Sequence, residues 1–164
     1  DFSSYRDYLA RAAVGSDPLH HAIVDLASGK AVGTAALMRI DPVHGVIETG
    51  HITYSPRMQR TPAATEAMYL FMRRVFDELG YRRLTWKCNA LNMPSRLAAD
   101  RLGFTYEGTL RAVLTVKGRR RDTAWFSILE DEWPSRRDAI AGWLDSANWG
   151  PDGRPRQSLS AFRR

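Results

Sequence analysis

The chain has 164 residues, of which 44% are hydrophobic and 26% charged, a composition that excludes collagen, coiled-coil arrays and disordered chains. A domain of this length buries enough apolar surface to fold without disulfides or a structural metal. Its net charge of +6 predicts an anionic partner, and the phosphates of a small cofactor would satisfy that as well as nucleic acid.

The compartment can be predicted from three absences in the sequence. No stretch approaches the ~20 apolar residues of a membrane span, and the first residues lack the apolar centre of a signal peptide. Cys88 is the single cysteine and cannot form an internal disulfide. We therefore expect a cytoplasmic protein with no membrane partner. Because the chain begins with Asp1 rather than Met, we also expect that an N-terminal element is missing.

The first third of the chain predicts one helix and then three strands. Apolar residues recur at helical spacing over 4–14, and this segment ends before Gly15. Two apolar runs, 21–27 and 31–40, flank a turn at 28–30, and a β-rich run follows at 46–54. The connections are short, so the three strands should pair antiparallel.

The clearest helix begins after this run. Apolar residues trace one face from Ala64 to Leu79, with Thr61 as the N-cap, Pro62 as the first helical residue and Gly80 at the end. A strand at 83–88 follows, and a helix of this length before it predicts a crossover with parallel pairing. A helix at 93–102, strands at 104–116 and 121–129, and a helix at 133–144 complete the pattern.

This order of elements predicts an α+β fold with mixed α/β layers and a partly antiparallel sheet. We expect one domain over residues 1–145. Residues 146–164 contain several Gly and Pro and few apolar side chains, so we expect a C-terminal tail or docking arm there.

A phosphate site is indicated where the third strand gives way to the long helix. The loop at 57–61 leads into the helix start, which aims free backbone N–H groups and the positive end of the helix dipole at one point. Such a terminus binds phosphate. An ordinary capped helix has the same features, so this pattern alone leaves both interpretations open.

Three motifs at fixed distances extend this observation. The loop and helix start read Q-R-T-P-A-A-T-E-A over 59–67, the next helix opens with N-M-P-S-R over 92–96, and it closes with R-L-G-F over 101–104. In this combination the chain resembles the GNAT superfamily of acetyl-coenzyme A dependent N-acetyltransferases, and within it the RimJ/RimL-like branch that acetylates ribosomal-protein N-termini. The resemblance covers residues 23 to 133 approximately and implies helices on both faces of a sheet with one splayed strand.

The resemblance also implies the ligand and its contacts. Acetyl-coenzyme A is the expected co-substrate; its pantetheine would pair with the edge of the splayed strand, and its pyrophosphate would lie on the loop and helix start. A backbone N–H near Ile52 or Thr53 would face the oxyanion. The expected cofactor contacts are Ile52, Thr53, Tyr54, Gln59, Arg60, Thr61, Pro62, Ala63, Ala64, Thr65, Asn92, Ser95 and Arg96.

Two positions depart from the family pattern. Pro62 stands where the middle Gly of the loop belongs and Arg60 replaces another Gly, so one N–H donor is lost, although the Arg60 charge can offset this loss. Ala99 occupies the place at which many members carry a tyrosine acid. Ser95 can take over as the acid, or it can simply cap the helix.

The reaction also needs a group that removes a proton from the amine. Glu48 is the first candidate, and strand alternation puts it on the same side as Gly50, Ile52 and Tyr54. A salt-bridged strand carboxylate is the alternative. His51 faces the other way and competes for the role if the strand carries a bulge.

No other residue set forms a better site. The histidines lack metal-ligand spacing, so no metal is expected, and Cys88 reads as a small buried hydrophobe. The basic hairpin tip at 117–121 either borders the acceptor cleft and favours acidic acceptors or is an ordinary polar turn.

We therefore expect an N-acetyltransferase in which a primary amine, of a small molecule or a protein N-terminus, attacks acetyl-coenzyme A directly in a ternary complex. A homodimer fits this branch. The alternative, motivated by Pro62, Arg60 and Ala99, is an inactive GNAT-like module that binds the cofactor. Nucleic acid is not an expected partner, because the motifs of nucleic-acid-binding domains are missing.

Overall fold

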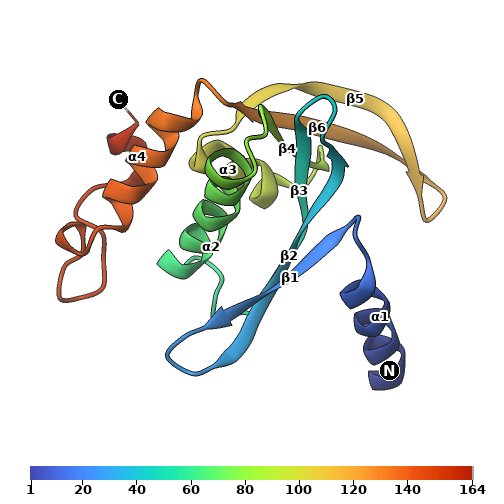
Figure 1. Ribbon diagram of the computed structural model, residues 1–164, viewed down its shortest axis with the longest axis horizontal. Coiled ribbons are helices and arrows are strands. Elements are labelled where there is room, and N and C mark those ends of the chain that lie inside the picture. Colours follow the sequence, from blue (N-terminus) through green and yellow to red (C-terminus); the bar gives the residue numbers. More distant parts are fainter. Residues whose placement is uncertain (164) are drawn as a thin grey trace.

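A computed structural model describes residues 1–163 of the chain. Six strands form one open sheet in the order β1-β2-β3-β4-β6-β5, in which every neighbouring pair is antiparallel except β3 and β4 (Figure 1). This confirms the α+β fold with a partly antiparallel sheet. The strands are β1 (Leu19–Asp25), β2 (Lys30–Asp41), β3 (Val46–Tyr54), β4 (Arg83–Asn89), β5 (Thr105–Val116) and β6 (Arg119–Leu129).

The helices lie largely where the apolar periodicity predicts them. The bounds predicted for α3 (Met93–Leu102) and α4 (Trp133–Leu144) are confirmed, and α1 (Phe2–Val14) starts two residues earlier than expected. The crossover through α2 (Pro62–Arg73) makes β4 parallel to β3, as the length of that connection requires. In the part of the chain that the structure describes, no helix is long and apolar enough to cross a bilayer.

The long helix that we expected as far as Leu79 changes its winding. After Arg73 it continues as a π-helix, η1 (Arg74–Glu78), before Gly80 with a φ of 67° ends it. The prediction of a uniform α-helix is therefore wrong over its last turn. The wider turn leaves Phe76 buried in the core and lets Asp77 accept a 2.6 Å hydrogen bond from the indole of Trp133.

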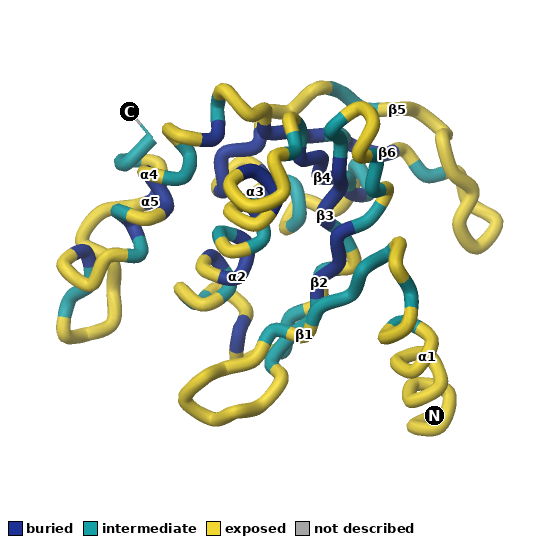
Figure 2. Tube along the Cα trace, viewed as in Figure 1, coloured by how far each residue is buried: buried dark blue, intermediate teal, exposed yellow. Residues whose placement is uncertain are grey.

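The core lies between one face of the sheet and the helices α2, α3 and α4. Figure 2 shows the buried residues concentrated in these helices and in the central strands. The least exposed core residues come from both strands and helices, whose side chains pack together. They are Leu37, Ile47, Met72, Val75, Leu84, Ile128 and Ile140.

The first helix lies on the opposite side of the sheet and contacts it beside β1. The His21 ring packs against Phe71 of α2 at 5.0 Å, so its neighbour His20 points to the other face, where the ring of Tyr8 in α1 lies 6.2 Å away. No residue of α1 is buried, and Figure 2 shows this helix exposed along its length. Helices therefore lie on both faces, as expected.

The C-terminal segment packs back onto the helices. It contains a 3-10 turn, η2 (Ser146–Asn148), and a short helix, α5 (Leu159–Phe162), of which Leu159 is only 2% exposed. The Asn148 side chain donates to the Trp143 carbonyl of α4 at 3.0 Å, and Arg163 donates to the Asp100 carbonyl of α3 at 2.6 Å. A domain boundary at residue 145 stays a prediction.

Candidate functional site

The two central strands part after a short common stretch. β3 and β4 pair over four residues only, from Val46 opposite Arg83 to Thr49 opposite Trp86. Beyond this point β4 stays with β6 and β3 stays with β2 as far as Tyr54. The facing edges of β3 and β4 are therefore without a strand partner, and the predicted splayed strand is confirmed.

A β-bulge lies in β3 where the strands part. Ala36 pairs with Gly50 and Thr34 pairs with Thr53, so two steps along β2 correspond to three steps along β3. The φ of His51 is 49° at this bulge, a value that is uncommon for a residue other than glycine. Such strained backbone is concentrated at functional sites.

The bulge changes which side chains share a face. Because Gly50 and Thr53 pair with residues two apart on β2, they lie on one side of the sheet, the side of Glu48, whereas Ile52 and Tyr54 lie on the other. The Tyr54 hydroxyl accordingly reaches the Ala64 carbonyl of α2. The expected alternation that placed Glu48 with Ile52 and Tyr54 is thus wrong beyond Gly50, since sequence periodicity does not register a bulge.

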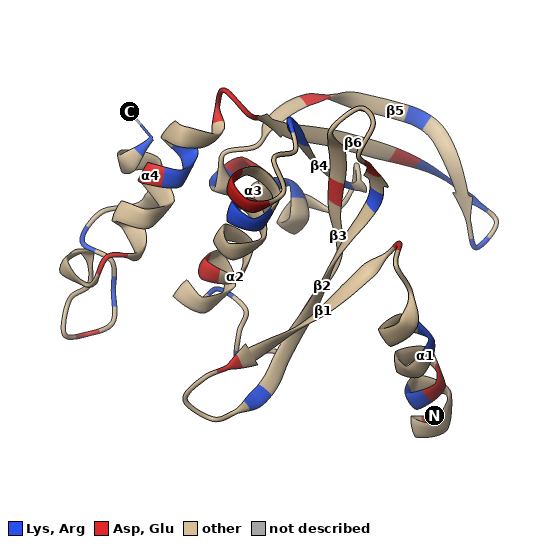
Figure 3. Ribbon diagram, viewed as in Figure 1, with Lys and Arg blue, Asp and Glu red and all other residues tan. Residues whose placement is uncertain are grey.

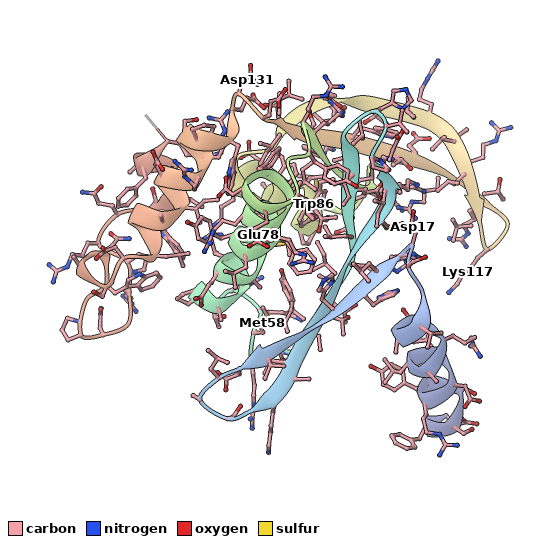
Figure 4. The ribbon with its side chains drawn as sticks, viewed as in Figure 1. Asp17, Met58, Glu78, Trp86, Lys117 and Asp131 are labelled. Carbon is pink, nitrogen blue, oxygen red and sulfur yellow. The ribbon has the colours of Figure 1, made fainter. Side chains whose placement is uncertain are left out.

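A cavity of about 350 Å³ opens where the strands part. In β4, Trp86 and Cys88 point toward the helices, and Lys87 and Asn89 point to the opposite face, so the cavity has walls from both faces of the sheet. Figure 4 shows Trp86 between α3 and the central strands. The lining residues are Thr49, Gly50, His51, Ile52, Trp86, Lys87, Cys88, Asn89, Asn92, Ser95 and Arg121.

The start of α3 supplies a hydroxyl to this wall. The Asn92 side chain accepts a hydrogen bond from the Ser95 amide at 3.3 Å, so Asn92 caps the helix and the alternative of Ser95 as the cap is wrong. The indole of Trp86 donates to Ser95 Oγ at 3.0 Å. Because this oxygen accepts the bond, its own hydrogen remains available for donation into the cavity.

Glu48 lies behind the wall and is held by two cations. Its Oε2 is 2.6 Å from Arg39 Nη1 and 2.7 Å from Lys87 Nζ, and the residue is only 6% exposed. Lys87 also lies 3.7 Å above the ring of Trp125. The salt-bridged alternative is therefore realised at Oε2, whereas Oε1 has no described partner and would lie 3.8 Å from a Cβ at Gly50.

The bulge brings a histidine to the cavity on the side of Glu48. The His51 ring lines the cavity and lies 5.3 Å from the ring of His20. The pKa of His20 is lowered, chiefly by burial and then by the positive charges that His51 and His21 would carry. His51 as an alternative base to Glu48 stays a prediction. Among the described residues, no three His, Cys, Asp or Glu side chains are grouped so as to bind a metal ion.

The loop before α2 has fewer free amides than expected. The amides of Gln59, Thr61 and Ala64 already donate to backbone carbonyls at 3.1, 3.3 and 3.2 Å. Within residues 1–163, the amides of Arg60 and Ala63 meet no backbone acceptor. Thr61 occupies the N-cap position, but its hydroxyl donates to the Met58 carbonyl at 2.7 Å and does not cap the helix, which corrects that prediction.

Other predicted contact residues have structural partners. The Gln59 side chain donates to the Tyr54 carbonyl at 2.9 Å, and the buried Thr65 hydroxyl accepts from Arg101 at 2.9 Å. Arg96 donates to the Ala90 carbonyl at 3.2 Å, which fixes the loop between β4 and α3.

The structure divides the predicted site into two groups. Ile52, Asn92 and Ser95 line the cavity, and Glu48 does not line it but pairs with Lys87 of its wall. The loop residues 59–65, by contrast, gather at the N-terminus of α2 and do not line the cavity. Sequence reasoning missed Trp86, Lys87 and Asn89, which strand alternation in β4 could have assigned to opposite faces. Of the segment 117–121, which we expected either to border the acceptor cleft or to form a polar turn, Arg121 lines the cavity.

A pH-dependent test follows from Tyr54, whose pKa is raised by burial from 10.0 to about 12. A phenol that holds its proton more tightly when folded contributes stability that is complete below pH 10 and is lost as the pH rises to about 12. Across that range we expect the unfolding free energy of wild type to fall by about 2 to 3 kcal/mol more than that of Tyr54→Phe. Urea unfolding at both ends of the range measures the difference, and equal losses would contradict it.

Comparison with known proteins identifies the family. The family described as acetyltransferase (GNAT) domain matches residues 3–105, more than half of the chain. The chain belongs to the GNAT family of acetyltransferases. A crystal structure of a GCN5-related N-acetyltransferase from Brucella melitensis is 50% identical, covers 99% of this chain and 74% of that one, and superposes with a TM-score of 0.97.

Two further GNAT relatives agree with this assignment. A probable acetyltransferase from Chromobacterium violaceum is 41% identical over 82% of this chain and 67% of its own, with a TM-score of 0.77. A Bacillus subtilis protein provisionally named a ribosomal N-acetyltransferase, YdaF, is 28% identical over 112 residues, 68% of this chain. The match spans 61% of that relative's length, and it supports the RimJ/RimL-like branch.

Proposed function

We propose that the protein transfers the acetyl group of acetyl-coenzyme A to a primary amine, which attacks directly in a ternary complex. The observation that carries this proposal is the parting of β3 from β4 at Thr49, with a cavity of about 350 Å³ whose walls come from both faces of the sheet. A site of this shape admits one reactant from the helix side and the other from the opposite face. A homodimer stays a prediction.

The helix side fits the cofactor. Beyond Thr49 the edge of β3 that faces β4 offers backbone groups without a strand partner, and the buried Thr49 hydroxyl on the cavity wall has no described partner. At the α2 terminus the amides of Arg60 and Ala63 and the Arg60 guanidinium are suited to phosphate. When bound, the cofactor supplies an acetyl group activated as a thioester.

The opposite face fits the amine. We propose that Glu48 removes the ammonium proton through a water at Gly50, using Oε1, with His51 as the alternative base. The backbone N–H of Ile52 or Thr53 would stabilise the negative charge that develops on the carbonyl oxygen. Ser95, whose hydroxyl hydrogen is available, would protonate the departing thiolate.

Calorimetric titration with acetyl-coenzyme A, followed by a thiol-release assay on a panel of amines, tests the proposal. Wild type is expected to bind and to release thiol only when an amine is present. Arg60→Ala is expected to weaken cofactor binding about 5- to 20-fold, because it removes a charge-assisted bond to phosphate. An unchanged dissociation constant for Arg60→Ala would remove that residue from the cofactor site.

A second candidate function is a GNAT-like module that binds the cofactor without turnover. It is favoured by Pro62, which has no N–H, by the occupied loop amides, and by Ala99, which is fully buried where a tyrosine acid would otherwise stand. Cofactor binding without thiol release from any amine would support this module over the enzyme.

A further inference from the structure

The cavity wall carries two cations and no carboxylate. Lys87 and Arg121 are the charged residues that line it, and neither Asp nor Glu does. The Lys87 ammonium is already paired with Glu48 at 2.7 Å. The Arg121 guanidinium makes no hydrogen bond or ion pair with any residue from 1 to 163, and its Nε is enclosed without a partner. Arg121 is therefore the uncompensated charge of the cavity.

Asp122, the acidic residue next to Arg121 in the sequence, does not pair with Arg121. Asp122 follows it in β6, so its side chain points to the other face of the strand, where it accepts a hydrogen bond from the Ala112 amide at 2.7 Å. Figure 3 shows basic residues outnumbering acidic ones along the outer part of the β5–β6 hairpin. Neutralisation of Arg121 therefore has to come from a ligand or from solvent.

Arg121 begins a row of donors without partners. Thr123 and Trp125 follow at two-residue intervals on the same face of β6, and Thr123 Oγ1 and Trp125 Nε1 are also enclosed without a described partner. Polar atoms in such positions are normally hydrogen-bonded, so three in a row require an explanation. Of the three residues, Arg121 lines the cavity, so a ligand rich in acceptor oxygens, or the water that it displaces, would satisfy its guanidinium.

The register shows which reactant this row would meet. Trp125 pairs with Lys87, and Lys87 pairs electrostatically with Glu48, so the row lies on the face of Glu48 and away from α2. The loop amides suited to the cofactor phosphates lie on the α2 side. Arg121 therefore faces the reactant that approaches Glu48 and His51, which is the acceptor.

We propose that the acceptor is an amine that also carries a carboxylate, and that Arg121 binds this carboxylate. The inference rests on the proposed acetyl transfer, because it names the acceptor class for the same site. A guanidinium presents planar, parallel N–H donors that match the two oxygens of a carboxylate. Where the guanidinium is partly shielded from solvent, these hydrogen bonds are strong. Amino acids and peptides with a nearby acidic group have this chemistry.

Acceptors compared in pairs that differ only in the charged group test the inference. We would measure kcat/KM by thiol release for amino acids and dipeptides and for their carboxamides, in wild type, Arg121→Gln and Arg121→Lys. Wild type is expected to prefer the acid by about 10- to 100-fold, and Arg121→Gln to reduce this preference to less than about threefold. Arg121→Lys should retain an intermediate preference, because the charge stays while the fork is lost.

Arg120→Gln is the matched control. Arg120 is an exposed neighbour in the same hairpin and does not line the cavity, so this variant loses the same charge and should keep the wild-type preference. The KM for acetyl-coenzyme A should be the same in all variants.

Three results would overturn the inference: equal kcat/KM for acid and amide in wild type, an equal loss on both in Arg121→Gln, or a change confined to the KM of the cofactor. These results leave the proposed acetyl transfer intact, since turnover is observed in each. If no amine is turned over, titration of the same pairs into protein saturated with coenzyme A measures the preference, and equal affinities would again refute it.

Discussion

Replacing Glu48 with Gln is expected to lower kcat by about 100- to 10,000-fold, the range over which a general base contributes. Gln keeps the size of the side chain and one acceptor oxygen, but it cannot take a proton from the amine. The binding of acetyl-coenzyme A should not change, because Glu48 lies on the acceptor face. Steady-state kinetics across pH, together with calorimetric titration of the cofactor, measures both quantities.

The variant His51→Gln tests whether His51, rather than Glu48, is the base. If Glu48 is the base, His51→Gln should lower kcat by less than about tenfold and leave the pH profile in place. A large loss in His51→Gln with a small one in Glu48→Gln would transfer the role of base to the bulge residue.

The Glu48 variant also loses stability, which sets the temperature of the assay. Removing one charge of a buried ion pair commonly costs about 3 to 5 kcal/mol. Because Arg39 is 59% exposed and Gln still offers an oxygen, we expect a smaller loss, about 2 kcal/mol. Thermal melting of the variant would confirm that the kinetics are those of folded protein.

Truncating Trp133 to Ala should cause the largest loss of stability. The side chain is 3% exposed, its ring stacks on Phe76 at 5.3 Å, and its indole donates to Asp77. We expect the free energy of unfolding to fall by about 3 to 5 kcal/mol, because the change leaves a large cavity and an unused acceptor. For a chain of this size that corresponds to a melting temperature lower by about 6–20 °C.

Two variants separate the causes of this loss. Trp133→Phe keeps most of the ring and removes the bond to Asp77, so it should cost about 1–2 kcal/mol. Leu26→Ala is the control for the removal of apolar atoms. Because Leu26 is 94% exposed, the melting temperature of this variant should equal that of wild type. A Trp133→Ala protein as stable as wild type would show that α4 does not hold the π-helical turn in place.

Local signals predicted most of the fold. The β-rich run at 46–54, which Ser55-Pro56 ends, predicted the bounds of β3, and Gly103 predicted the end of α3, because Pro and Gly act on the backbone at their own positions. The π-helical turn at 74–78 could not be predicted in this way. Its contact partner, Trp133, is 56 residues away from Asp77, and a preference that depends on such a contact leaves no local pattern.

The site was predictable to a smaller extent. The motif at 92–96 placed Asn92 and Ser95 on the cavity wall, since a short helix start fixes both residues at once. The pairing of Glu48 with Arg39 and Lys87 depends on the order of strands in the sheet, and the bulge at His51 depends on the register with β2. Neither the strand order nor the register is encoded within one strand. The sides of the sheet on which Glu48, Ile52 and Tyr54 lie could therefore be read only from the structure.

The short seam between β3 and β4 has a mechanical consequence. Four residue pairs, together with the helical crossover, join the three-stranded unit β1–β2–β3 to the three-stranded unit β4–β6–β5, so the sheet is least resistant to opening along this line. A ligand bound in the cavity between β3 and β4 would contact both units and hold them together. The thermal stability should therefore rise with the occupancy of this cavity. Each tenfold increase of the ligand concentration above its dissociation constant should add about 1.4 kcal/mol to the free energy of unfolding.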